Sequence, residues 1–342
     1  MSGLQRWSLG RLLMTILISI AGWAVVATGC LMVGSTGSFG WPTSASQMEV
    51  RKEVVLTASL VGAALAAAGV AYQAILRNPL ADPYLLGASS GASLAAYLWR
   101  FPFFSGLLLS GGGQAISQQS FAFAGAIVSV GIVFALAGSR GRLEPLTLLL
   151  VGVIVNAVNG SIFLFVDAIH KGLPAGEGPL TFLVGAIQTN LTPSQFYLAL
   201  AIIALGLVVL LYVSGELNVA ALGDVEAESM GVRIGQLRWI ALITASLVTA
   251  AAVAISGPIG FVGLVCPHVA RLIVGRDQRV LLPASTALGA ALLAIADAVS
   301  RKLAGSGGLE TVLPVGVLTG LLGGPFFLLL LWHSRRSKTG TV

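Results

Sequence analysis

Side chains that could break bonds or bind a metal are few in this sequence and far apart. His170, His268 and His333 do not fall in a metal-binding spacing such as H-E-x-x-H, and Cys30 and Cys266 lie in separate apolar runs. A phosphate-binding G-x-x-x-x-G-K-[ST] loop is also absent from the sequence. We therefore expect no catalytic residue, no metal site and no cofactor in this chain.

One pair of charged residues stands inside an apolar run. Acids in such runs often serve as proton relays or ion sites, and Asp297 is one of very few here. Arg301 follows four residues later, so it lies on the same face of a helix. We favour a local ion pair near the end of that helix, with a proton relay as the alternative.

The composition places the chain in a membrane. Its 342 residues are 56% hydrophobic and only 9% charged, and the mean hydropathy is +0.93. A soluble domain has about a quarter of its residues charged. The net charge of +6 comes from basic residues scattered in short loops, which predicts a role in membrane topology and no nucleic-acid partner.

Apolar runs of spanning or near-spanning length follow one another without the alternation typical of a β-barrel. The first resembles a signal peptide, but at about 22 residues it exceeds the roughly 7–15 of a signal core, so we expect a retained spanning helix. The expected fold is all-α, a single polytopic domain over residues 1–342 with its core at 50–335. The ten runs are 12–33, 54–76, 86–99, 120–138, 145–167, 194–213, 237–256, 260–274, 280–303 and 312–333.

Positive charges predict the orientation. If the N-terminus is cytoplasmic, thirteen Lys and Arg residues fall in cytoplasmic loops and six in outer loops. Because cytoplasmic loops carry an excess of basic residues, we expect both termini in the cytoplasm and an even number of spans.

Glycine and proline interrupt the apolar pattern at two corresponding places. RNPLADPYLLGASSGAS, Arg77 to Ser93, leads into a short third run, and SGPIGFVGLVCPHVAR, Ser256 to Arg271, surrounds a short eighth run. Paired broken segments are typical of transporters with an internal inverted repeat and a pathway at the repeat interface. Small residues four apart predict close helix packing at Gly87/Gly91, within the first broken segment, and at Gly320/Gly324.

The longest cytoplasmic segment, Ser214 to Gln236, contains a short run between two glycines that could form about two turns of helix. Asp224 is the expected N-cap of this helix. A solvated connector is the plainer interpretation, but Leu222, Val225 and Met230 would then expose apolar side chains to water. We therefore favour a docking element for a cytoplasmic partner.

Three motifs, in order, resemble the FecCD-type permeases, the membrane subunits of ABC importers for ferric siderophores, haem and cobalamin. The motifs are GAALAAAGVAYQAILRNPLADPYLLGASSGAS, GPIGFVGLVCPHVARLIVGRDQRVLLP, and ADAVSRKLAG followed by LPVGVLTGLLGGPFF. The resemblance implies a type II ABC importer permease fold in the bacterial inner membrane and a homodimer with its pathway at the dimer interface. It also implies two copies of a separate ATPase, which bind ATP and magnesium, and a periplasmic or lipid-anchored substrate-binding protein.

The resemblance assigns roles to particular residues. The cytoplasmic gate would be formed by Asn78, Pro79, Leu80, Glu144, Pro145 and Thr147. Coupling to the ATPase would fall to Leu222, Gly223, Asp224, Val225, Glu226, Glu228, Met230 and Gly231. At the outer face, Arg51, Lys52 and Arg301 would pair with acids on the binding protein, although the family often has a second arginine where this chain has Val54.

Asn156, Asn159 and Ser161 on the fifth run are the candidate pathway residues. Their amide and hydroxyl groups suit a bulky, already coordinated chelate better than a bare cation, which would need rings of carboxylates or carbonyls. The choice among ferric siderophore, haem and cobalamin stays open. The alternative function is an ion-coupled secondary transporter, and an integral membrane enzyme is a third reading with no clustered reactive groups to support it.

Overall fold

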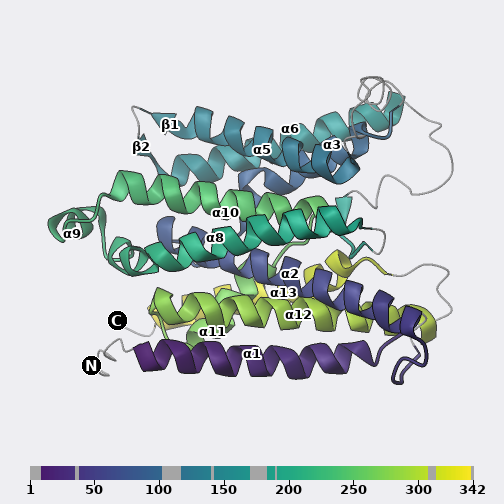
Figure 1. Cartoon of the computed structure of the whole chain (residues 1–342). Coiled ribbons are helices and arrows are strands. Elements are labelled where there is room, and N and C mark those ends of the chain that lie inside the picture. The colour runs from purple at the N-terminus through teal and green to yellow at the C-terminus, as the bar shows by residue number, and fades with distance from the viewer. Residues whose placement is uncertain are drawn as a thin grey trace.

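The computed structural model describes residues 9–34, 38–101, 117–139, 142–169, 183–188, 191–306 and 313–339. Within these residues the chain forms eleven α-helices, most of which run side by side in one bundle (Figure 1). Helices α3, α5 and α6 lie along one side of the bundle, and α1 and α12 lie along the opposite side (Figure 1).

The elements have the following bounds. The α-helices are α1 (Leu9–Leu31), α2 (Ala45–Ile75), α3 (Ala88–Leu98), α5 (Gln118–Ala137), α6 (Pro145–Ile169), α8 (Pro193–Ala220), α9 (Asp224–Ser229), α10 (Ile234–Ser256), α11 (Val262–Val274), α12 (Gln278–Ser306) and α13 (Val315–Thr339). A 3-10 helix, η1 (Pro83–Leu86), precedes α3, and β1 (Gly138–Ser139) pairs antiparallel with β2 (Arg142–Leu143).

Each of the ten predicted apolar runs coincides with one helix, and the eleventh described helix is the short α9. By length and composition alone, seven described helices could cross a membrane: α1, α2, α5, α6, α8, α10 and α12. The two runs predicted to be short are short: α3 has 11 residues and α11 has 13. The largest difference is at α2, which begins at Ala45 because the Ser44 side chain caps its N-terminus, accepting a hydrogen bond from the Gln47 N–H.

Helix α2 is the centre of the bundle. It packs against α12, α10, α11 and α8, and nearly all of its residues from Val54 onward are buried. Its run of alanine and glycine lets neighbouring backbones come close. At Gly62 a Cβ atom would lie 2.1 Å from the Gly289 carbonyl oxygen of α12, so only glycine permits this approach.

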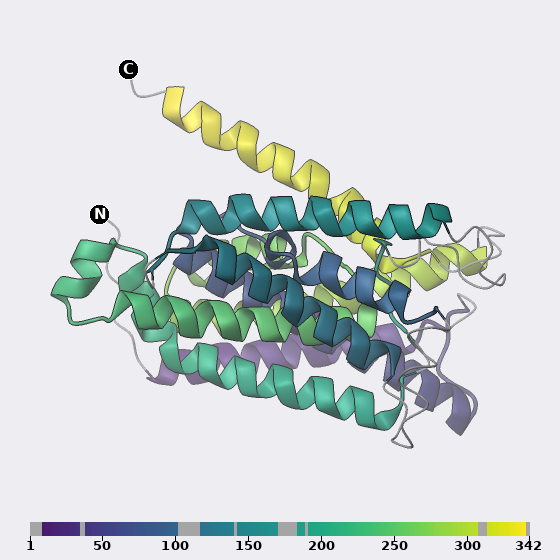
Figure 2. The ribbon, with the colours of Figure 1, turned by 90° about the horizontal axis from the view of Figure 1, so that it is seen from above.

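The two small-residue pairs behave differently. Gly91 on α3 packs so closely on α5 that a Cβ atom there would lie 2.5 Å from the Gly125 carbonyl oxygen, as predicted. Gly320 and Gly324 on α13 have no neighbour within 4 Å of a Cβ position in the described part of the chain. Much of α13 leaves the body of the bundle (Figure 2).

The start of α1 and the end of α13 lie at the same end of the bundle as α9 (Figure 1). The predicted even number of crossings agrees with this arrangement.

Candidate functional site

The turn after α2 is held in a fixed shape by its own side chains. Asn78 Oδ1 accepts a hydrogen bond from the Leu80 N–H at 3.0 Å, and the Ala81 N–H donates to the Asn78 carbonyl at 3.0 Å. Pro79 adds a locked φ. Arg77 enters the turn in the left-handed region with φ 48°, a conformation that costs a non-glycine residue about 1–2 kcal/mol.

The Arg77 side chain offsets this cost by bonding to the end of α8 and the start of α9. Its Nε donates to the Ala220 carbonyl at 2.9 Å, and a terminal nitrogen donates to the Asp224 carboxylate. Arg238 of α10 donates to both oxygens of the same carboxylate, at 2.9 and 3.0 Å. The prediction that Asp224 caps α9 is wrong, because Gly223 holds the N-cap position and the Asp224 carboxylate is bound by two arginines.

Helix α9 exposes an apolar surface at this end of the bundle. Leu222, Val225 and Met230 are 67%, 77% and 62% exposed, as the sequence predicted, whereas Ala227 is buried. Glu226 and Glu228 are exposed beside them. Gly231 ends the helix with φ +83°, a left-handed conformation that glycine adopts without strain.

The start of α6 is organised by Glu144. Its carboxylate accepts a hydrogen bond from Thr147 Oγ1 at 2.9 Å, and its carbonyl accepts one from the Leu148 N–H. Pro145 is the first residue of α6. The start of α6 lies at the end of the bundle that also carries α9 (Figure 1), so these predicted gate residues share an end with the predicted coupling segment.

The two broken segments meet in the middle of the fold. Asp82 accepts hydrogen bonds from the Tyr84 N–H at 2.9 Å and from the Phe261 N–H at 3.2 Å. Its carboxylate therefore caps η1 and also satisfies a backbone donor just before α11, where Phe261 has φ 69°. Segments from the two halves of the sequence are thus joined directly.

Two of the three predicted pathway residues line one polar pocket. Asn159 donates to Ser90 Oγ at 2.9 Å and to Ser129 Oγ at 3.0 Å, and Asn156 donates to the Tyr84 carbonyl at 3.2 Å. The lining of this pocket includes Tyr84, Ser90, Ser93, Asn156, Asn159 and Phe163.

The volume of this polar pocket is about 130 Å³. Sequence reasoning missed Tyr84, Ser90 and Ser93, although serines three residues apart on a short helix share one face and could have indicated a polar surface. Ser161 lies elsewhere, on the exposed face of α6, where its hydroxyl donates to the Ala157 carbonyl at 2.8 Å.

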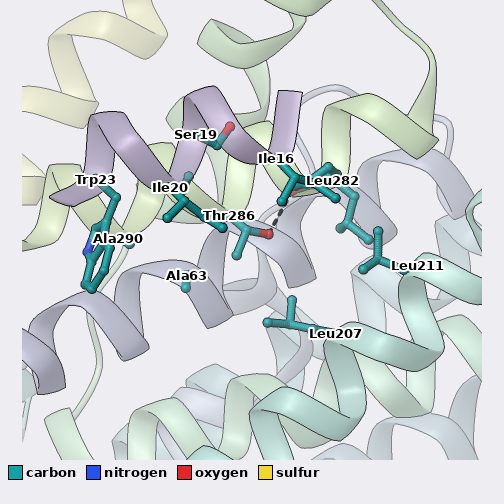
Figure 3. A pocket seen from close by; sticks show the side chains of 12 residues that line it. Ile16, Ser19, Ile20, Trp23, Ala63, Leu207, Leu211, Leu282, Thr286 and Ala290 are labelled. Atoms are coloured by element: carbon teal, nitrogen blue, oxygen red, sulfur yellow. Dashed lines mark hydrogen bonds between the residues drawn. The ribbon is translucent and has the colours of Figure 1, made fainter. Parts of the chain in front are cut away.

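A larger cavity of about 300 Å³ lies among α1, α2, α8 and α12 (Figure 3). Its lining is almost entirely apolar and includes Ile20, Trp23, Leu207 and Leu282. The Thr286 hydroxyl in its wall already donates to the Leu282 carbonyl at 2.7 Å (Figure 3). We do not assign this cavity to a polar pathway, because it offers a polar substrate few hydrogen-bonding groups.

The arginines predicted for the outer face are buried, so the expectation that they are exposed is wrong. Arg51 donates to the carbonyls of Leu31 and Gly40, at 2.9 and 2.7 Å. Arg301 donates to Asp297 Oδ2 at 2.9 Å, which confirms the local ion pair, and also to the Val33 carbonyl. Carbonyls beyond the end of a helix lack intrahelical partners, and here the arginines satisfy them.

Lys52, in contrast, is exposed at the same end of α2. His170 lies outside the described residues, and the side chain of His333 is not described, so the expectation about three histidines is not tested. Among the described residues, no group of three His, Cys, Asp or Glu side chains could hold a metal ion.

Residues 9–333 match the FecCD transport family. This chain belongs to that family. The match covers α1 to α13, so the family assignment made from three motifs is confirmed over nearly the whole chain.

Relatives of this FecCD-family chain include two permeases with assigned transport systems. The chain is 38% identical to the cobalamin import system permease protein of Halobacterium salinarum, over 86% of this chain and 75% of the relative. It is 37% identical to the hemin transport system permease protein of Yersinia pestis, over 88% and 89% of the two chains.

A solved structure shares the fold of this FecCD-family chain. It is described as an inward-facing conformation of a metal-chelate type ABC transporter, with a TM-score of 0.76 and 27% identity over 94% of this chain and 99% of the other. The expected all-α integral membrane fold of a type II ABC importer permease is therefore confirmed.

Proposed function

We propose that this chain is the permease subunit of a binding-protein-dependent ABC importer that carries a bulky metal chelate across the inner membrane. The observation that carries the proposal is the segment around α9, in which Leu222, Val225 and Met230 are exposed while two arginines bind Asp224, the first residue of the helix. An apolar surface that is both exposed and held in place is typical of a docking site.

The partner at α9 is a separate ATPase subunit, present in two copies, which binds ATP and magnesium. The names of the relatives and of the solved structure support this assignment. Glu226 and Glu228 would face polar or basic groups of the ATPase, and the exposed apolar residues would fill a groove on it. With α9 in the cytoplasm, both termini are cytoplasmic as well.

A second copy of the chain completes the permease. The exposed face of α6 and the uncovered glycines of α13 offer surfaces for it. In such a homodimer the pathway runs between the two copies, and Ser161 on the exposed face of α6 lies beside it. Lipid covers the apolar surface that the partner copy leaves free.

The polar pocket supports a chelate as the substrate. Its amide, hydroxyl and phenol groups can hydrogen-bond to the periphery of a siderophore, haem or cobalamin. A bare cation would need carboxylates or a ring of carbonyls to replace its water. The relatives' names include cobalamin and hemin, which supports the same class of substrate.

A substrate-binding protein docks at the opposite end from α9. Lys52 supplies an exposed charge there, while Arg51 and Arg301 bind the carbonyls of Leu31, Val33 and Gly40. Lys52→Glu should slow association of the binding protein at low salt, because such contacts mainly set the association rate and are screened by salt. Arg233→Glu, at an exposed arginine beside α9 at the opposite end, is the matched control and should leave this rate unchanged.

The function is tested by reconstituting the chain with its ATPase and binding protein in proteoliposomes. Uptake of cyanocobalamin, haemin and ferric citrate is measured with ATP, without ATP, and without binding protein. Uptake of one chelate that needs both ATP and binding protein is expected. Uptake driven by a proton or sodium gradient without ATP would show an ion-coupled secondary transporter instead.

A further inference from the structure

Two arginines bind the Asp224 carboxylate, one from 147 residues away in the sequence and one from 14 residues away. Arg77 reaches it from the turn after α2, and Arg238 reaches it from α10. Arg77 also donates to the Ala220 carbonyl at 2.9 Å, at the end of α8. The gate turn is therefore bonded to both sides of the short connection that leads into α9.

The two arginines hold α9 to different parts of the molecule. Arg238 binds both carboxylate oxygens of Asp224 from a helix that packs against α2, α8 and α5, so it fixes α9 to the body of the bundle. Arg77 binds the same carboxylate from a turn, one residue before Asn78. The Arg77 contact joins α9 directly to the predicted gate turn.

The turn that follows Arg77 is stiff enough to carry a displacement. The Asn78 side chain closes it by accepting a hydrogen bond from the Leu80 N–H, and the Asn78 carbonyl accepts one from the Ala81 N–H. Asp82 then fixes the far side of the turn through the N–H groups of Tyr84 and Phe261. Because these hydrogen bonds restrict rotation of the backbone within the turn, a movement of Arg77 should also move Leu80.

We propose that Arg77 is a positioning residue that transmits movement of α9 to the gate turn at Asn78–Leu80, with Asp224 as the shared anchor. This inference rests on the proposed function, in which the ATPase moves α9. When α9 is displaced, the Asp224 carboxylate pulls the Arg77 guanidinium with it. The backbone of Arg77, already in the left-handed region, turns Asn78 and Leu80 with it.

A purely structural role predicts something different. Exposed ion pairs contribute little to stability, and the Arg77 and Asp224 side chains are 35% and 42% exposed. Arg238 is the more buried partner, at 12% exposure, and makes two bonds to Asp224. If these contacts only hold α9 in place, loss of Arg238 should do at least as much harm as loss of Arg77.

The test uses a thiol at the gate in the full complex of permease and ATPase. Leu80→Cys introduces a reactive group in the turn, and the native Cys30 and Cys266 are buried. Labelling by a membrane-impermeant maleimide is timed in proteoliposomes without nucleotide and after trapping with ATP and vanadate. In the Leu80→Cys parent, the labelling rate should change several-fold on trapping.

Arg77→Gln in this background should abolish the change in labelling rate while ATP hydrolysis and ATPase binding persist. Arg77→Lys should restore part of the change, because lysine keeps the charge but lacks the two-pronged donor group. Arg238→Gln should keep the change, and Arg233→Gln, at an exposed arginine of the same end, controls for loss of positive charge.

Retention of the full nucleotide response in Arg77→Gln, or equal loss in Arg77→Gln and Arg238→Gln, would overturn the inference. Absence of ATPase binding or of ATP hydrolysis in the parent complex would instead overturn the proposed function. ATPase binding and ATP hydrolysis in the Leu80→Cys parent therefore distinguish failure of the inference from failure of the proposed function.

Discussion

Gly69 of α2 packs directly on Gly263 of α11, so that a Cβ atom on Gly69 would lie 1.9 Å from the Gly263 carbonyl oxygen. Gly263 belongs to one of the two broken segments, and its carbonyl also accepts a hydrogen bond from Gln73 Nε2 at 3.3 Å. Arg271 in turn donates to Gln73 Oε1 at 3.0 Å. The central helix and the second broken segment are therefore locked together backbone to backbone.

Gly69→Ala should destabilise the protein by about 1–3 kcal/mol, since the added methyl group must push two backbones apart. The measurement is thermal unfolding of the purified protein in detergent. Gly131→Ala on α5, where nothing lies within 4 Å of a Cβ position, is the matched control and should leave stability nearly unchanged. Equal unfolding temperatures in the two variants would contradict the close approach.

Simultaneous replacement of Leu222, Val225 and Met230 by alanine should weaken binding of the ATPase without unfolding the permease. These side chains are exposed, so their truncation removes little packing within the chain. Co-purification of the ATPase and its stimulated activity are measured beside thermal unfolding. Normal assembly and normal uptake in the triple variant would favour a solvated connector.

Cross-linking of Leu80→Cys between the two copies of a dimer should block uptake while ATP hydrolysis continues. The hydrogen bond from Leu80 and the locked φ of Pro79 hold the turn in one shape, so a covalent bond between the turns of the two copies prevents the gate from opening. Uptake of the transported chelate is compared before and after reduction of the cross-link, which serves as the control. Full uptake after confirmed cross-linking would remove Leu80 from the pathway.

Asn159→Leu should impair both the polar pocket and the packing of α6 on α3 and α5. The change leaves the hydroxyls of Ser90 and Ser129 without the amide that donates to them, at a cost of about 1–3 kcal/mol. Asn159→Gln keeps an amide group and should retain more of the stability and of the uptake. Identical uptake kinetics in the leucine variant and the parent would separate Asn159 from the substrate.

Arg301→Leu should destabilise the protein by about 3–5 kcal/mol, because the buried Asp297 carboxylate loses its ion-pair partner. The double variant Asp297→Leu/Arg301→Leu removes both charges and should recover much of the loss. Thermal unfolding of the two variants and the parent provides the comparison. A double variant as unstable as Arg301→Leu would show that the contact of Arg301 with Val33, and not the ion pair, holds this region.

Local features of the sequence were sufficient for the helices and for one ion pair. Ten apolar runs became ten helices because length and apolar content dictate helix formation in a membrane, where each backbone group must be bonded within the chain. Asp297 and Arg301 met because residues four apart face each other on a helix. Leu222, Val225 and Met230 are exposed, as expected for apolar residues in a short segment between two helices.

Contacts between distant segments were decided only by the tertiary structure. The Asp224 carboxylate could have capped α9, but folding brings Arg77, 147 residues away in sequence, within its reach. Arg51 and Arg301 were expected to be exposed to a binding protein. Both are buried, because backbone carbonyls at and just beyond the end of α1 accept their hydrogen bonds. The charge of a residue and its spacing from its neighbours can be taken directly from the sequence. The hydrogen-bond partner of a long side chain depends instead on which helix ends pack beside it in the folded chain.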